Sequence, residues 1–163
     1  MTRLTPEIRR FVTHQRLAHV ATVSREGLPH VSPKGSLRVF GDDELVWADI
    51  QSTVTVQNIR ANPRTEIEVV DVYVRKGYRF KGTSRVLESG DVHNKVVGLY
   101  HSEGADVSRI NAIVLMRVES VSTLISPVYA KGFDEREVGR LWEEYYSRSF
   151  LKSVLDLVPP QEF

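Results

Sequence analysis

Six short segments rich in apolar and β-branched residues, separated by turn residues, place the strongest constraint on the fold. In the clearest one, Thr65, Ile67 and Val69 alternate with charged residues, the pattern of a half-buried antiparallel strand. Strands and helices do not alternate regularly, which argues against a parallel doubly wound sheet. We therefore expect a mainly β (α+β) fold, a six-stranded antiparallel barrel with flanking helices, because closure removes exposed strand edges. The predicted strands span residues 17–23, 29–40, 44–48, 64–71, 78–88 and 111–126.

Capping residues and apolar spacing predict the flanking helices. Thr5-Pro6-Glu7 begins one helix, which we expect to end near His14, and a short helix over 53–61 is stopped by Asn62-Pro63. Asp91 is predicted to cap a third helix. A capping box over 134–137 begins the last, in which Trp142 and Tyr145 are predicted to face a core. The segment 150–158 is so apolar that we expect it to be buried, against a second subunit.

Length and charge limit the classes of protein to which the chain can belong. The 163 residues form one domain, residues 1–163, with a formal net charge of +1. A protein with so little net charge does not attract nucleic acid or an anionic membrane electrostatically, so we expect neither partner. The absence of cysteine excludes disulfides, thiolate catalysis and cysteine-based metal sites. The amino-terminal charges do not fit a signal peptide, and we expect a cytoplasmic protein.

No familiar catalytic motif is present. The five histidines include no pair at the i,i+3 or i,i+4 spacing of a helical metal site, and neither an HExxH motif nor a dinucleotide fingerprint occurs. We predict no metal ligands and name no side chain as a catalytic acid, base or nucleophile. His30 precedes the Ser-Pro-Lys-Gly segment and could border a ligand there, with an ordinary surface position as the preferred expectation.

Three segments could bind an anionic ligand. The turn 49–55 leads into the short helix, whose first amides and macrodipole favour phosphate, although an ordinary helix cap explains its hydroxyl residues equally well. In segment 31–36, Gly35 suits close approach of a ligand to the backbone, with a β-bulge as the alternative. In segment 77–82, Arg79 and Lys81 share one strand face and require either solvent or an anion.

These segments belong to an ordered series between residues 17 and 82. It reads Leu-Ala-His-Val-Ala-Thr-Val, Val-Ser-Pro-Lys-Gly-Ser, Leu-Val-Trp-Ala-Asp, a Ser-Thr-x-Thr helix entry and Lys-Gly-Tyr-Arg-Phe-Lys-Gly. Over roughly residues 10–90 the chain resembles the flavin-binding split barrels of the pyridoxamine 5′-phosphate oxidase-like superfamily. The resemblance implies a split β-barrel, FMN as cofactor and a homodimer with the cofactor at the subunit interface. The contacts it implies are Ser32, Pro33, Lys34, Ala48, Asp49, Ser52, Thr53 and Thr55, with Asn58, Arg79 and Lys81 as weaker candidates.

The chain departs from the true oxidases at two places. Their helix entry supplies a basic pair to the phosphate, where this chain has Val54 and Thr55. Lost charge-assisted bonds cost about 1.5–3 kcal/mol each. Either a cation elsewhere compensates, or FMN binds weakly, or another ligand is used; the candidate cations are Lys34, Arg60, Arg79 and Lys81. The carboxyl-terminal motif that grips pyridoxamine phosphate is also missing, and we do not expect pyridoxamine phosphate oxidase activity.

Three functions are compatible with these features. The first is an FMN-dependent oxidoreductase that acts on a small molecule, with a reduced nicotinamide or another small donor. The second is a non-catalytic flavin- or haem-binding carrier, sensor or stress protein, because a fold alone does not confer activity. The third is a barrel that has lost its cofactor. A deazaflavin coenzyme in place of FMN stays open.

Overall fold

The computed structural model describes residues 4–51 and 53–157, with side chains as far as Lys152. Two compact units are distinguished by their contacts. The first comprises Met1–Val70 and Gly77–Thr123, and the second Asp71–Lys76 and Leu124–Phe163. The single-domain assignment over 1–163 stays a prediction.

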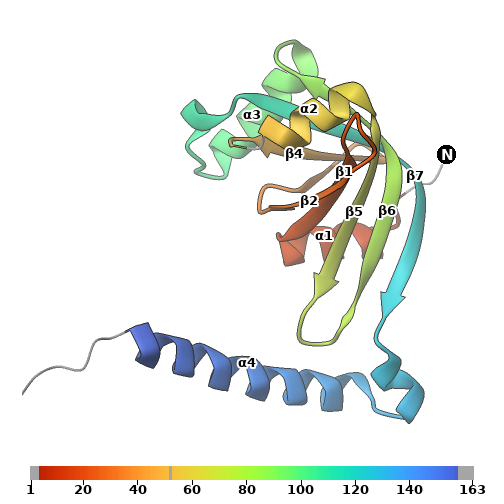
Figure 1. Cartoon of the computed structure of the whole chain (residues 1–163), viewed down its shortest axis with the longest axis vertical. Helices are drawn as coiled ribbons and strands as arrows, with labels where there is room; N and C mark the ends of the chain where they lie inside the picture. Colours follow the sequence, from red (N-terminus) through yellow and green to blue (C-terminus); the bar gives the residue numbers. More distant parts are fainter. Residues whose placement is uncertain (1–3, 52, 158–163) are drawn as a thin grey trace, which may run out of the picture. The chain divides into compact units, whose positions relative to one another are not determined.

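The first unit is built on one antiparallel sheet, as expected, with helices packed against it (Figure 1). The described strands number seven, in the order β2-β1-β5-β6-β7-β4-β3. They are β1 (Ala18–Val23), β2 (Pro29–Lys34), β3 (Arg38–Phe40), β4 (Glu44–Asp49), β5 (Arg64–Asp71), β6 (Lys76–Leu87) and β7 (Ala112–Ile125).

The predicted strand 29–40 is in fact two strands, which corrects the expected count of six. β2 pairs with β1 (Val20 opposite Ser32), whereas β3 pairs with β4 (Val39 opposite Leu45). β2 and β3 are thus the two edges of the sheet, and only residues 35–37 connect them. Three residues span about 10 Å, so the two edges lie close together and the sheet is rolled into a barrel.

Ser36 fastens this junction. Its hydroxyl oxygen accepts a hydrogen bond from the Ala48 amide of β4 (3.0 Å), and the Tyr100 hydroxyl donates to the Ser36 carbonyl (2.7 Å). The Ser36 side chain therefore takes the place of a backbone hydrogen bond to β4 at the point where β2 has ended and β3 has not yet begun.

Two apolar clusters hold the first unit together. The barrel interior contains Trp47, Phe80 and Met116, each at most 1% exposed, together with residues of α1 (Pro6–Gln15) and α2 (Thr53–Ala61). On the other face of β4 and β7, Val96 and Tyr100 of α3 (Asp91–Ser102) form the second cluster. A short 3₁₀ helix, η1 (Val107–Arg109), leads into β7.

The helix starts agree with the capping prediction at Thr5 and differ at Asp91. The Thr5 hydroxyl oxygen accepts a hydrogen bond from the Ile8 amide (3.3 Å). Asp91 is instead the first residue of α3, and the cap position is Gly90 at φ 101°. The φ angle explains the difference, because a left-handed region of this kind favours glycine.

The second unit contains the β5–β6 turn, η2 (Pro127–Lys131) and α4 (Glu135–Leu157). The predicted capping box is present: the Glu137 amide donates to Asp134 Oδ1 (2.8 Å) and the Asp134 amide to Glu137 Oε2 (2.7 Å). The prediction that Tyr145 faces a core is wrong, because its side chain is 56% exposed. Tyr145 is exposed because Trp142, on a neighbouring side of the helix, is the residue that packs against Arg75 of the β5–β6 turn. Phe150 and Leu151 are 66% and 59% exposed within this chain. The side chains of residues 153–158 lie outside the described part, and burial of the segment against a second subunit stays a prediction.

Among the described residues, no helix is both long enough and apolar enough to cross a bilayer.

Candidate functional site

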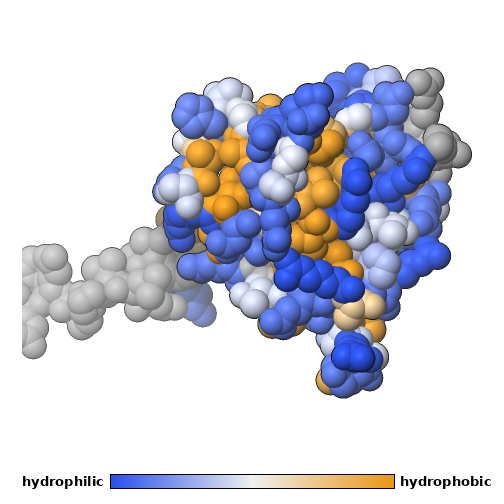
Figure 2. All heavy atoms as spheres, turned by 90° about the horizontal axis from the view of Figure 1, so that it is seen from above, coloured by the Kyte–Doolittle hydropathy of each residue, from blue (hydrophilic) through white to orange (hydrophobic). Residues whose placement is uncertain are grey.

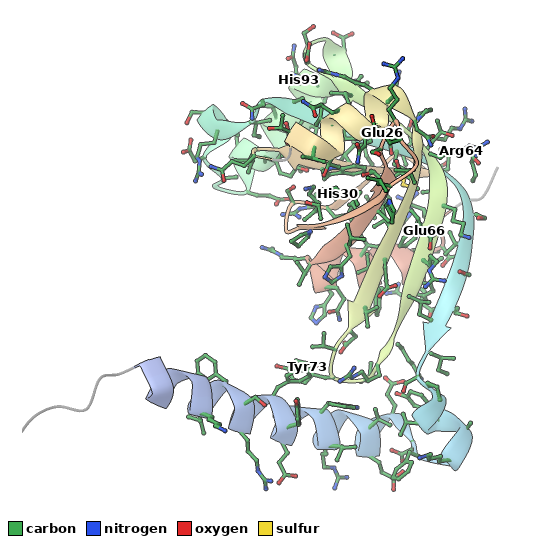
Figure 3. The ribbon with its side chains drawn as sticks, in the orientation of Figure 1. Glu26, His30, Arg64, Glu66, Tyr73 and His93 are labelled. Atoms are coloured by element: carbon green, nitrogen blue, oxygen red, sulfur yellow. The ribbon has the colours of Figure 1, made fainter. Side chains whose placement is uncertain are left out.

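The edge strand β2 carries a row of polar side chains on one face. His30, Ser32 and Lys34 alternate along the strand, and Ser32 and His30 lie directly opposite Val20 and Thr22 of β1. Residues directly opposite in an antiparallel pair share a face, and Val20 and Thr22 are buried. The row therefore points to the same side of the sheet as the barrel interior; Figure 3 labels His30 on β2.

Lys34 is the buried cation of this row. Its side chain is 5% exposed, and its ammonium donates a hydrogen bond to Ser32 Oγ (2.6 Å). Burial lowers the pKa of Lys34 from its usual value of 10.5, and the charge of Asp49 opposes that shift. Asp49 is the last residue of β4 and is 6% exposed. A buried ammonium and a buried carboxylate thus influence each other where β2 and β4 end.

Helix α2 begins shortly after Asp49. Thr53 is its first residue and is exposed. Thr55 lies in the first turn and is 1% exposed, and no described residue forms a hydrogen bond with its Oγ1. The first-turn amides of a helix also lack partners within the helix, so donors accumulate here, four residues after Asp49. This combination suits an anionic group. Ser52, predicted to contact the phosphate, lies outside the described residues.

Other predicted contacts have structural partners. The buried Asn58 amide donates to Thr22 Oγ1 (3.0 Å), which fastens α2 to β1. Ala48 is hydrogen-bonded through its backbone to Ser36. Pro33 is exposed, on the face of β2 opposite the polar row.

The structure does not bring Arg79 and Lys81 to Lys34. They alternate with the buried Phe80 on β6, and both meet carboxylates of β5. Arg79 Nε lies 2.9 Å from Glu66 Oε1, and Lys81 Nζ lies 3.4 Å from Glu66 Oε2; Figure 3 labels Glu66 on β5. Protein carboxylates therefore supply the anion that this cationic pair requires. Arg60, near the end of α2, is likewise paired with Glu88.

His30 and Thr22 are the residues at the site that the sequence interpretation underrated. The period-two spacing His30-x-Ser32-x-Lys34 places the histidine on the Lys34 face and could have identified it. Thr22 could not be found in this way, because its role depends on α2 packing against β1. Within the described part of the chain, no group of three or more side chains could hold a metal ion.

Comparison with known proteins gives a consistent assignment. The profile of the pyridoxamine 5′-phosphate oxidase family matches residues 4–123. The crystal structure of HupZ from Group A Streptococcus is 30% identical and covers 75% of this chain and 94% of its own (TM-score 0.68). An FMN-binding protein from Syntrophomonas wolfei is 13% identical over 74% of this chain and 85% of its own (TM-score 0.63). HutZ, a haem storage protein from Vibrio cholerae, is 19% identical over 76% of this chain and 96% of its own (TM-score 0.60). At these lower identities the similarity concerns the fold alone. No functionally curated protein matches the sequence.

Proposed function

This chain belongs to the pyridoxamine 5′-phosphate oxidase family, and from that premise we propose that it binds FMN and catalyses oxidation or reduction of a small molecule. A reduced nicotinamide or another small donor would supply the electrons. The observation that carries the proposal is Lys34, a buried cation held by Ser32 where β2 and β4 end, just before α2. Asp49 offsets only part of the cost of burying this cation, and an ammonium with so little solvent around it attracts an anion more strongly than one in water.

The residues present fit a flavin nucleotide. Its phosphate would be held at the first turn of α2 by backbone amides, Thr53 and the otherwise unsatisfied Thr55 hydroxyl, with Lys34 supplying the positive charge that Val54 and Thr55 do not. Its ring would contact Ser32 on β2 and Asp49 at the end of β4. Ala48 would contribute through its backbone, because its side chain packs in the α3 cluster, and Pro33, on the opposite face of β2, stays a predicted contact. When bound, the flavin supplies the redox chemistry, and the protein contributes position and electrostatics. Ser52 stays a predicted contact, and Asn58, Arg79 and Lys81 are weaker candidates because each already has a protein partner.

We propose a homodimer formed through the outer surface of β2. Leu17, Leu28 and Val31 are 51%, 65% and 61% exposed, and Figure 2 shows apolar side chains at the surface between polar ones. Pro29 and Pro33 lack amide hydrogens, so this edge is poorly suited to strand addition and better suited to side-chain packing.

The first experiment is an absorption spectrum of the purified protein, with mass spectrometry of any chromophore released on denaturation. A two-band yellow spectrum with released FMN would support the proposal. A colourless protein that takes up no added FMN would contradict it and favour a barrel that has lost its cofactor.

Titration with FMN would then test the assigned residues. Lys34→Met should raise the FMN dissociation constant about ten-fold or more, whereas Lys95→Met, the same change at an exposed lysine of α3, should leave it unchanged. Thr53→Glu should weaken binding by placing a negative charge beside the phosphate, with Thr53→Gln as the uncharged control. Unchanged affinity in both Lys34→Met and Thr53→Glu would remove this region from the cofactor site.

The alternative is a non-catalytic carrier or sensor of flavin or haem. The fold similarity to HutZ and the position of His30 in the Lys34 row favour this candidate. Turnover of a reduced nicotinamide with an electron acceptor separates the two functions, and spectral titration with haemin identifies the haem-binding variant of the alternative.

A further inference from the structure

Helix α3 holds the corner of the sheet that follows Lys34. The Tyr100 hydroxyl donates a hydrogen bond to the Ser36 carbonyl (2.7 Å), and Ser36 comes two residues after Lys34. Tyr100 is 3% exposed and belongs to the apolar cluster that packs α3 on β4 and β7. Close packing fixes the phenol ring, so the backbone that its hydroxyl contacts is held in place as well.

Ser36 also ties the ends of β2 and β4 to each other. Its Oγ accepts a hydrogen bond from the Ala48 amide (3.0 Å) and donates one to the Ala48 carbonyl (3.4 Å). Ala48 is followed directly by Asp49, the buried carboxylate at the end of β4, and Lys34 is the last residue of β2. The position of Ser36 therefore helps to set how the Lys34 ammonium lies relative to the Asp49 carboxylate.

A second contact of α3 secures the other side of the same corner. Arg38, the first residue of β3, pairs with Glu103 directly after the end of α3 (2.7 Å), and its guanidinium lies 5.7 Å from the centre of the Tyr100 ring. Between the two held positions, Leu37 is buried in the barrel interior. The chain is thus fastened at three successive residues, 36–38, and has little freedom to shift.

We propose that Tyr100 is a positioning residue of the cofactor site, which acts through Ser36 to hold Lys34 and Asp49 in the arrangement that binds an anionic ligand. This inference rests on the proposed function of that site. Burial raises the pKa of the Tyr100 phenol above its usual value of 10.0, so the hydroxyl remains a donor at neutral pH. Without that hydroxyl, the corner can shift and admit water to Lys34, and a hydrated ammonium attracts a phosphate less strongly.

Removal of one oxygen atom tests the proposal in the full-length protein. Tyr100→Phe keeps the ring and loses the hydroxyl. Tyr129→Phe is the matched control, because the Tyr129 hydroxyl also donates to a backbone carbonyl, that of Val74 in the second unit (2.5 Å). In a fluorescence titration with FMN at neutral pH, the dissociation constant should rise about five-fold in Tyr100→Phe and stay unchanged in Tyr129→Phe. A wild type and a Tyr100→Phe protein that bind FMN equally well would overturn the proposal.

A second variant tests the route through Ser36. Ser36→Ala removes both hydrogen bonds to Ala48 and should weaken FMN binding at least as much as Tyr100→Phe does. When Ser36→Ala is already present, adding Tyr100→Phe should change the dissociation constant by less than about two-fold, because the two residues act in series. Effects that multiply as if the residues were independent would contradict this route. Should Tyr100→Phe not fold, unchanged FMN affinity in Ser36→Ala would overturn the proposal by itself.

A measurement on the flavin-free protein separates positioning from a general loss of stability. The pKa of Lys34, which burial lowers from 10.5, can be followed by NMR of isotope-labelled lysine side chains, with Lys34→Met identifying its signal. In Tyr100→Phe this pKa should move toward 10.5 as water reaches the ammonium, whereas in Tyr129→Phe it should not move. A Lys34 pKa that is the same in Tyr100→Phe as in the wild type would overturn the proposal.

The two measurements also distinguish failure of this inference from failure of the proposed function. A wild-type protein that binds no FMN contradicts the proposed function, and the Lys34 titration then decides whether Tyr100 positions the lysine. A wild type that binds FMN, together with a Tyr100→Phe protein unchanged in both FMN affinity and Lys34 titration, refutes the role of Tyr100 and leaves FMN binding intact.

Discussion

A buried lysine is one of the least common features of a protein interior, and Lys34 illustrates how such a residue is tolerated. Ser32 accepts one of its hydrogen bonds, and the charge of Asp49 offsets part of the desolvation. The arrangement costs some stability, and a cation held at so little solvent exposure interacts more strongly with an anion than a cation in water does.

The lowered pKa of Lys34 determines the direction in which the free energy of unfolding changes with pH. Between that lowered value and the unfolded value of 10.5, the unfolded chain binds more protons than the folded protein, so stability rises with pH. Lys34→Met removes this contribution. The free energy of unfolding of the wild type, minus that of Lys34→Met, should therefore increase as pH approaches 10.5, as measured by urea denaturation at a series of pH values. Lys81→Met is the matched control, and a difference that stays constant or decreases would contradict the role of burial.

At the scale of the elements, β6 leaves no room for a side chain where Gly82 faces β7. A Cβ atom added at Gly82 would lie 2.0 Å from the carbonyl oxygen of Arg117, so the two strands would have to separate. Gly82→Ala should lower the free energy of unfolding by more than about 3 kcal/mol. Gly98→Ala in α3 is the control: nothing lies within 4 Å of its added Cβ, and a gain of about 0.5–1 kcal/mol is expected. Chemical denaturation of both variants measures these changes. A Gly82→Ala protein as stable as the wild type would show that β6 and β7 can separate at little cost.

The end of α3 is joined to β3 by the pair Arg38–Glu103, whose closest approach is 2.7 Å. The hydrogen bond from Arg38 lowers the pKa of Glu103 below its usual value of 4.5. The carboxyl group therefore stabilises the fold above pH 4.5, and this contribution disappears as pH falls through the lowered value.

Replacement of that carboxyl by an amide tests the link. Glu103→Gln should cost about 0.5–1 kcal/mol at neutral pH, and the cost should vanish in strong acid, where Glu103 is protonated in both states. Thermal unfolding at neutral and acidic pH checks the expectation, with Glu143→Gln at an exposed position as the control. A cost that persists unchanged in acid would attribute the effect to packing rather than to charge.

At the scale of the whole molecule, cofactor binding should appear as stability. FMN at 100 times its dissociation constant stabilises the folded state by about 2.7 kcal/mol, which for a chain of this length corresponds to a rise in Tm of roughly 5–10 °C. Riboflavin, which lacks the phosphate, should produce a smaller rise if the first turn of α2 holds the phosphate. Differential scanning fluorimetry with both compounds makes the measurement. Equal rises would place the phosphate elsewhere, and no rise with FMN would indicate that the barrel does not bind it.

Much of the local structure was predictable because its causes lie within a few residues of one another. The alternation over 64–71, the Thr5 cap and the capping box at Asp134 depend on neighbours in the chain, and all three occur in the structure. The same locality explains the errors at 29–40 and at Tyr145. Propensity identifies extended chain or helix, but it does not specify which strand an extended segment joins or which side of a helix finds a partner.

The sequence alone therefore determined the antiparallel barrel class, the helix starts at Thr5 and Asp134, and Lys34, Ser32 and the start of α2 as candidates for an anion site. Only the tertiary structure decided that residues 29–40 divide between the two edges of the sheet and that Glu66 neutralises Arg79 and Lys81. It also decided that Lys34 is buried near Asp49. The physical reason is that burial and ion pairing are set by residues distant in the chain, whereas alternation and capping are set by the nearest neighbours.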